Sequence, residues 1–212
     1  MSITPEIDDW LHRAGYEYHC FISWPHTAND DITKCARKLK REIESRLAPY
    51  VSRPKVFLDE RVLSPGDDWP DTIKNALCRS LTMVAICAPI YYHPDHKWCG
   101  LEWATMQLLS DVRLKGVDFK AIIPVMIRKS DPLPAVFSRI QYADFTAMTT
   151  RSHYYFFSTE FRNKAEQIVN NIQRVAATIR KNLAQPDCEN LAYATVSAFD
   201  GYTPAPPAFP FR

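Results

Sequence analysis

A tryptophan and a glutamate stand four residues apart in the segment Trp98-Cys99-Gly100-Leu101-Glu102. On a helix this spacing places both side chains on one face. A carboxylate beside an aromatic wall can stabilise a developing positive charge or trap it covalently, as in glycoside hydrolysis. Two plainer interpretations stay open, because a glutamate near a helix start is also favoured by the helix dipole when fully solvated, and the tryptophan could be a core residue.

His93, His96 and Cys99 follow one another at intervals of three residues. A zinc site would need a further ligand or water and supporting groups around it, and this spacing fits no standard metal motif. A nucleophilic Cys99/His96 pair is no better supported. The chain has neither a GxGxxG nor a GxxxxGK[ST] loop, so we expect no metal and no tightly bound cofactor.

The composition is that of one ordinary globular domain with extensions. The chain has 212 residues, 46% of them hydrophobic and 24% charged, with a formal net charge of +2. This charge gives little reason to expect nucleic-acid or membrane binding, and no apolar run approaches the roughly 20 residues of a spanning helix. The six cysteines form no CxxC pair, which favours reduced thiols and a cytoplasmic protein without a secretory signal.

Strand and helix patterns alternate along the chain. Apolar runs predict strands at 18–23, 55–58, 81–87, 121–127 and 140–145, and helical periodicity predicts helices at 32–47, from about 70, after 97, and from Phe161 to Ile179. Such alternation indicates a five-stranded parallel sheet with helices on both faces, a flavodoxin-like three-layer α/β fold. Ligands of such folds bind at the carboxyl ends of strands, here the segments after residues 23, 58 and 87.

The expected organisation is an N-terminal extension at 1–15, a domain at 16–183, and a tail at 184–212 that is rich in proline and aromatic residues. Its aromatic content argues against a purely solvated linker. The tail either packs against the domain or makes a contact elsewhere.

Three segments carry a resemblance to a known family. They are Cys20-Phe21-Ile22-Ser23, then Val56-Phe57-Leu58-Asp59 followed by Ser64-Pro65-Gly66, and then Trp98 to Glu102. In this order and at this spacing they resemble the hallmark regions of TIR domains, from about Tyr18 to Leu183. Asp59 to Pro70 is similar to the BB loop, and Glu102 falls on the glutamate with which NAD+-cleaving TIR domains break the nicotinamide–ribose bond.

The resemblance implies an NAD+ hydrolase or cyclase that produces nicotinamide and ADP-ribose or a cyclic isomer, with NAD+ as substrate and no cofactor. It implies self-association through the BB loop, and a role in bacterial antiphage signalling with a separate sensor or effector, as in Thoeris-like systems. The residues it assigns to the site are catalytic Glu102 and substrate-binding Phe21, Ser23, Trp24, Asp59, Trp69, Trp98 and Cys99. The alternatives are a non-catalytic TIR scaffold and an enzyme resembling nucleoside deoxyribosyltransferases.

Overall fold

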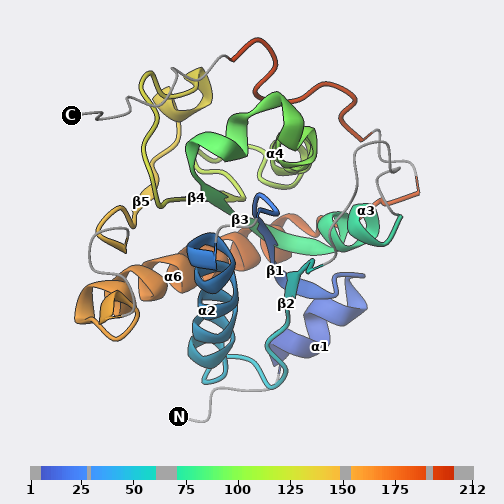
Figure 1. Ribbon diagram of the computed structural model, residues 1–212. Helices are drawn as coiled ribbons and strands as arrows, with labels where there is room; N and C mark the ends of the chain where they lie inside the picture. Colours follow the sequence, from blue (N-terminus) through green and yellow to red (C-terminus); the bar gives the residue numbers. More distant parts are fainter. Residues whose placement is uncertain (1–5, 28–29, 61–70, 149–153, 190–192, 203–212) are drawn as a thin grey trace, which may run out of the picture.

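The computed structural model describes residues 6–27, 30–60, 71–148, 154–189 and 193–202 (Figure 1). The strands are β1 (Tyr18–Ser23), β2 (Val56–Leu58), β3 (Ser80–Cys87), β4 (Ile122–Met126) and β5 (Ala143–Asp144). The α-helices are α1 (Glu6–Arg13), α2 (Asp30–Leu47), α3 (Asp71–Cys78), α4 (Lys97–Arg113) and α6 (Thr159–Asn182), and the 3-10 helices are η1 (Pro89–Tyr92), η2 (Pro94–His96) and η3 (Ala135–Ser138).

Within this part of the chain the strands form one parallel sheet in the order β2-β1-β3-β4-β5. Successive side chains of β3 alternate between its two faces: Met83 and Ala85 join the apolar cluster beneath α3 and α4, whereas Val84 and Ile86 join the cluster beneath α2 and α6. In Figure 1, α4 lies over one face of the sheet and α2 and α6 lie under the other. The α/β class and the three layers are as the alternating pattern predicts.

The predicted elements agree with the observed ones within a few residues, with two exceptions. The fifth strand is only two residues long, Ala143–Asp144, where the sequence predicts a strand over 140–145. The second is α1, which was not predicted and lies in the expected N-terminal extension. Its Leu11 is fully buried in the cluster on the α4 side of the sheet.

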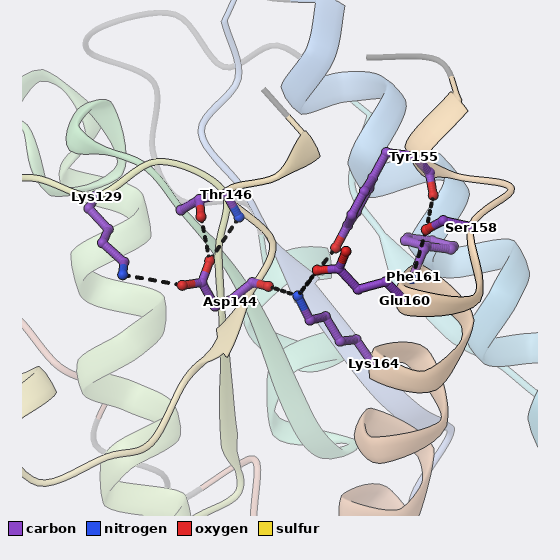
Figure 2. Close-up of polar contacts among 8 residues, drawn as sticks. All are labelled: Lys129, Asp144, Thr146, Tyr155, Ser158, Glu160, Phe161 and Lys164. Carbon is purple, nitrogen blue, oxygen red and sulfur yellow. Dashed lines mark hydrogen bonds and ion pairs between the residues drawn. The ribbon is translucent and has the colours of Figure 1, made fainter. Parts of the chain in front are cut away.

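Polar side chains attach the short strand β5 to the start of α6 (Figure 2). Ser158 caps α6 by accepting a hydrogen bond from the Phe161 amide at 3.1 Å. One turn later, Lys164 Nζ donates to the main-chain carbonyl of Asp144 and, at 2.6 Å, to Glu160 Oε1. The Lys164 ammonium group therefore holds the end of β5 against α6, in addition to the few hydrogen bonds that this short strand makes with β4.

The structure corrects the expectation of uniformly reduced cysteines. Cys78 at the end of α3 and Cys188 in the tail form a disulfide across 110 residues of sequence. The four other cysteines are free and buried, and there the expectation holds. The disulfide joins the tail to the same side of the sheet that carries α4.

Residues 193–202 of the tail pack against the domain. For this part of the tail, the first of the two alternatives left open by the sequence therefore holds. Phe199 is only 6% exposed and belongs to the apolar cluster on the α4 side. The Ala194 amide donates to Thr105 Oγ1 of α4 at 3.1 Å. Among the helices that the structure describes, none is long and apolar enough to cross a membrane.

Candidate active site

The candidate site lies where β1 and β2 end. Parallel strands present their carboxyl ends at one edge of the sheet, so Ser23, the last residue of β1, and Asp59, which follows β2, lie at the same edge. The Glu102 side chain reaches this edge from the second turn of α4. The short helix η1, which begins two residues after β3 ends, contributes Tyr91.

Glu102 is a buried carboxyl group within a chain of hydrogen bonds. It is 9% exposed, and its Oε2 accepts a hydrogen bond from Ser23 Oγ at 2.5 Å. Ser23 Oγ lies 2.7 Å from the Tyr91 hydroxyl. Either hydroxyl can be the donor in this contact. When Glu102 is ionised it accepts the single hydroxyl proton of Ser23, and Tyr91 then donates to Ser23. The interpretation of Glu102 as a solvated carboxylate at a helix start is therefore wrong.

The protonation of Glu102 follows from this environment. Burial raises its pKa from 4.5 to about 8; the Ser23 hydrogen bond opposes that shift, and the nearby charge of Asp59 adds to it. Burial also raises the pKa of the Tyr91 hydroxyl and of the Cys99 thiol well above their ordinary values. Near neutral pH both of these groups stay neutral, whereas Glu102 changes between its protonated and ionised forms as the pH passes through about 8.

Asp59 and Trp24 form a second part of the site. Asp59 is 8% exposed, and its main-chain carbonyl accepts a hydrogen bond from Trp24 Nε1 at 3.0 Å. The Trp24 ring stacks on His26, with centroids 4.3 Å apart and planes inclined by 22°. One face of the indole is therefore covered by the His26 ring and cannot stack on a ligand. Trp24 instead links the segments that follow β1 and β2 through its hydrogen bond to Asp59.

The remaining predicted site residues lie at different depths. Phe21 is a core residue of β1, stacked on Phe57 with ring centroids 5.2 Å apart. Trp98 is partly buried against the apolar cluster on the α4 side of the sheet, to which Phe21 also belongs. Lys97 Nζ lies 4.6 Å from the centroid of the Trp98 ring. Cys99 is buried in the first turn of α4. Trp69 and most of the BB-loop segment, residues 61–70, lie outside the described residues.

Two residues of the site were not predicted: Tyr91, which orients Ser23, and His26, which stacks on Trp24. The rule that ligands bind after strand ends points to both segments, since His26 follows β1 by three residues and Tyr91 follows β3 by four. Burial lowers the pKa of His26, while the charge of Asp59 opposes this effect. His26 Nδ1 is buried without a hydrogen-bond partner.

No group of three or more histidine, cysteine, aspartate or glutamate side chains could hold a metal ion in the part of the chain described. The His93 ring interacts locally, with its Nδ1 accepting from the Asp95 amide at 3.3 Å.

Comparison with known proteins adds the family. A family model described as TIR domain matches residues 20–154, which include the last four residues of β1, all of β2 to β5 and the whole of α4. No curated protein matches the chain.

Proposed function

Because the chain belongs to the TIR domain family, we propose that it cleaves NAD+ at the nicotinamide–ribose bond, with Glu102 as the catalytic carboxylate. The observation that carries the proposal is the buried Glu102, oriented by Ser23 at the carboxyl edge of the sheet, with Asp59 close enough to raise its pKa.

The chemistry needs one well-placed carboxylate. The bond between ribose C1′ and the pyridinium nitrogen breaks, its electron pair leaves with nicotinamide as a neutral molecule, and positive charge develops on the ribosyl group. The Glu102 carboxylate stabilises that charge or binds the carbon covalently. Water then completes hydrolysis to ADP-ribose with release of a proton, or another atom of the same ADP-ribosyl group attacks and closes a ring.

The electrostatics of the site suit a cationic ligand. Asp59 and Glu102 are both buried, and the charge of the first disfavours the ionised form of the second. A pyridinium ring beside them would stabilise the carboxylate form of Glu102 and so lower its pKa. Substrate binding thereby generates the reactive form of the catalytic group.

The test is incubation of the purified full chain with NAD+ and identification of the products by mass spectrometry. We expect nicotinamide together with ADP-ribose or an isomer of cyclic ADP-ribose. A matched control is Glu166→Gln, which removes a carboxylate of α6 that is paired with Arg46 on the opposite face of the sheet and should leave the rate unchanged. Absence of NAD+ loss even when the protein is clustered would favour the scaffold function, and cleavage of deoxynucleosides instead would favour a deoxyribosyltransferase.

The wider biological setting is part of the same proposal. The protein acts in the cytoplasm as a bacterial antiphage signal generator, with a separate sensor or effector, and self-associates through the BB-loop segment from Asp59 to Pro70. Family resemblance supports these statements. The Cys78–Cys188 disulfide would there meet reducing conditions.

The pH dependence of the reaction follows from Glu102. Its carboxylate is the reactive form and its pKa in the free protein is about 8, so kcat/KM should rise about tenfold for each pH unit below 8 and level off above it. Initial rates of NAD+ loss between pH 5.5 and 9 measure this profile. The other groups facing Glu102 are Asp59, Tyr91 and Cys99, and burial keeps the last two neutral over this range.

Ser23→Ala is the matched variant for the profile. It removes the hydrogen bond that lowers the pKa of Glu102, so the midpoint should move above 8 and the rate at pH 7 should fall. A profile that is flat between pH 6 and 8, or a midpoint that moves down in Ser23→Ala, would contradict the assignment of Glu102.

A further inference from the structure

A segment of the tail lies across the helix that carries Glu102. This segment, residues 193–202, is called the strap below. The Ala198 amide donates to the Gly100 carbonyl at 3.1 Å, and the Ala194 amide donates to Thr105 Oγ1 at 3.1 Å. These two contacts fall on either side of Glu102 in the sequence of α4. The strap therefore fixes the first turns of the helix.

The contact at Gly100 depends on the absence of a side chain. A Cβ atom at this position would lie 1.8 Å from Ser197 Oγ and 2.8 Å from Ser197 Cβ. Because real Cβ atoms essentially never come so close to another atom, any residue other than glycine would push Ser197 away. Gly100, the third residue of the Trp98-to-Glu102 segment, is thus the position on α4 where the strap makes its closest approach to the helix.

Phe199 links the strap to the hydrogen bonds of the site. Its buried ring packs edge-on against Tyr91, Tyr92 and Trp103, with centroid distances of 5.8, 4.9 and 5.5 Å. The hydroxyl of that same Tyr91 contacts Ser23, which donates to Glu102. The strap thus supports the ring whose hydroxyl orients the Ser23–Glu102 pair.

The chain on both sides of Phe199 is attached to the domain. Cys188, before the strap, is bonded to Cys78 of α3. At the other end, the Tyr202 hydroxyl donates to the Pro132 carbonyl at 2.9 Å and its ring packs edge-on against Tyr92 at 5.7 Å. These attachments keep the strap on α4 without a separate partner.

We propose that the strap is a positioning element of the Glu102 site, which holds Tyr91 and the first turns of α4 so that the Glu102 carboxyl stays buried and hydrogen-bonded to Ser23. Phe199 is its positioning residue, because its ring packs on Tyr91, and it does not have to touch the substrate. The effect on turnover rests on the proposed NAD+ cleavage, whereas the effect on the burial of Glu102 does not.

The test compares the full chain with Gly100→Ala, Ser197→Gly and the two changes together. In the double variant, loss of the Ser197 side chain removes both close contacts, so the strap can return. Ser197→Gly alone is the matched control, because it loses only the local hydrogen bond from the Phe199 amide. Alanine is the better helix former, so a loss in Gly100→Ala does not come from a weaker helix.

The first readout needs no substrate. In each background, the pH dependence of the stability difference between Glu102 and Glu102→Gln, measured by denaturant unfolding, reports the pKa of Glu102. The midpoint of the Glu102 titration in the folded state is the pH above which this difference becomes constant, and we expect it near 8 in the wild type and in Ser197→Gly. It should lie at least one pH unit lower in Gly100→Ala, where water reaches the carboxyl, and return in the double variant. The charged or titratable groups facing Glu102 are again Asp59, Tyr91 and Cys99.

The second readout is NAD+ cleavage. We expect kcat to fall at least tenfold in Gly100→Ala with a smaller change in KM, and to recover in the double variant. Phe199→Ala should act in the same direction, and Phe199→Leu should restore most of the loss. An unchanged midpoint in Gly100→Ala, or no recovery in the double variant, would overturn the role of the strap. Midpoints that move as expected without NAD+ cleavage in any variant would overturn the proposed function alone.

Discussion

Glu102→Gln should abolish NAD+ cleavage, with a loss in kcat of about 10³-fold or more. The amide has nearly the size of the carboxyl, and its oxygen can still accept the hydrogen bond from Ser23 that the structure shows at 2.5 Å. What it lacks is the negative charge that stabilises the developing ribosyl cation. The measurement is the initial rate of nicotinamide release at pH 8, where wild-type Glu102 is about half ionised.

Two controls separate loss of charge from loss of structure. Glu166→Gln makes the same chemical change on α6, where Glu166 is paired with Arg46 at 2.5 Å, and should keep the wild-type rate. NAD+ binding to Glu102→Gln, measured by calorimetry, should weaken far less than turnover. If Glu102→Gln releases nicotinamide within tenfold of the wild-type rate, Glu102 is not the catalytic carboxylate.

The same substitution should stabilise the folded protein at high pH. The pKa of Glu102 in the folded state, about 8, lies above the ordinary 4.5 expected after unfolding, so the folded state holds this proton more tightly. The stability of the wild type relative to Glu102→Gln is therefore greatest below pH 4.5. It falls by about 1.4 kcal/mol for each pH unit up to 8 and is constant above. Urea unfolding of both proteins at pH 5, 6.5 and 8 measures this difference.

The opposite outcome has a clear meaning. If the two proteins keep a constant stability difference between pH 5 and 8, Glu102 titrates normally, and the burial of its carboxyl beside Asp59 has no energetic consequence. If the wild type instead loses stability relative to Glu102→Gln as the pH rises to 8, the folded state is destabilised at the residue that the reaction needs. This is a common compromise between stability and activity.

The order of strands and helices could be predicted because apolar periodicity is a local property of the sequence. Every residue of β3 is buried, and its run of apolar residues is typical of a strand covered on both faces. The strand β5 could not be delimited in this way, because it is a short edge strand whose end depends on Lys164 of α6. The helix α1 is also short, and its Leu11 is buried only through contacts distant in sequence.

The sequence indicates where the candidate site should lie, but not the hydrogen bonds and the burial of its residues. The spacing of Trp98 and Glu102 and the rule of strand ends indicate where a carboxylate should lie. No local pattern shows that the Tyr91 hydroxyl contacts Ser23, because the two residues are 68 apart and meet only when β1 and β3 pair. The raised pKa of Glu102 likewise results from tertiary burial. The approach of Ser197 to Gly100 joins residues 97 positions apart.

The Cys78–Cys188 bond encloses β3, α4, β4, β5 and α6 within one covalent ring. A single protease cut anywhere between these two cysteines opens the ring without releasing a fragment. The nicked protein should then migrate as one species on a denaturing gel without reductant and separate into two pieces when dithiothreitol is added. Cleavage of the backbone near Glu102 would therefore leave the molecular mass of the oxidised protein essentially unchanged.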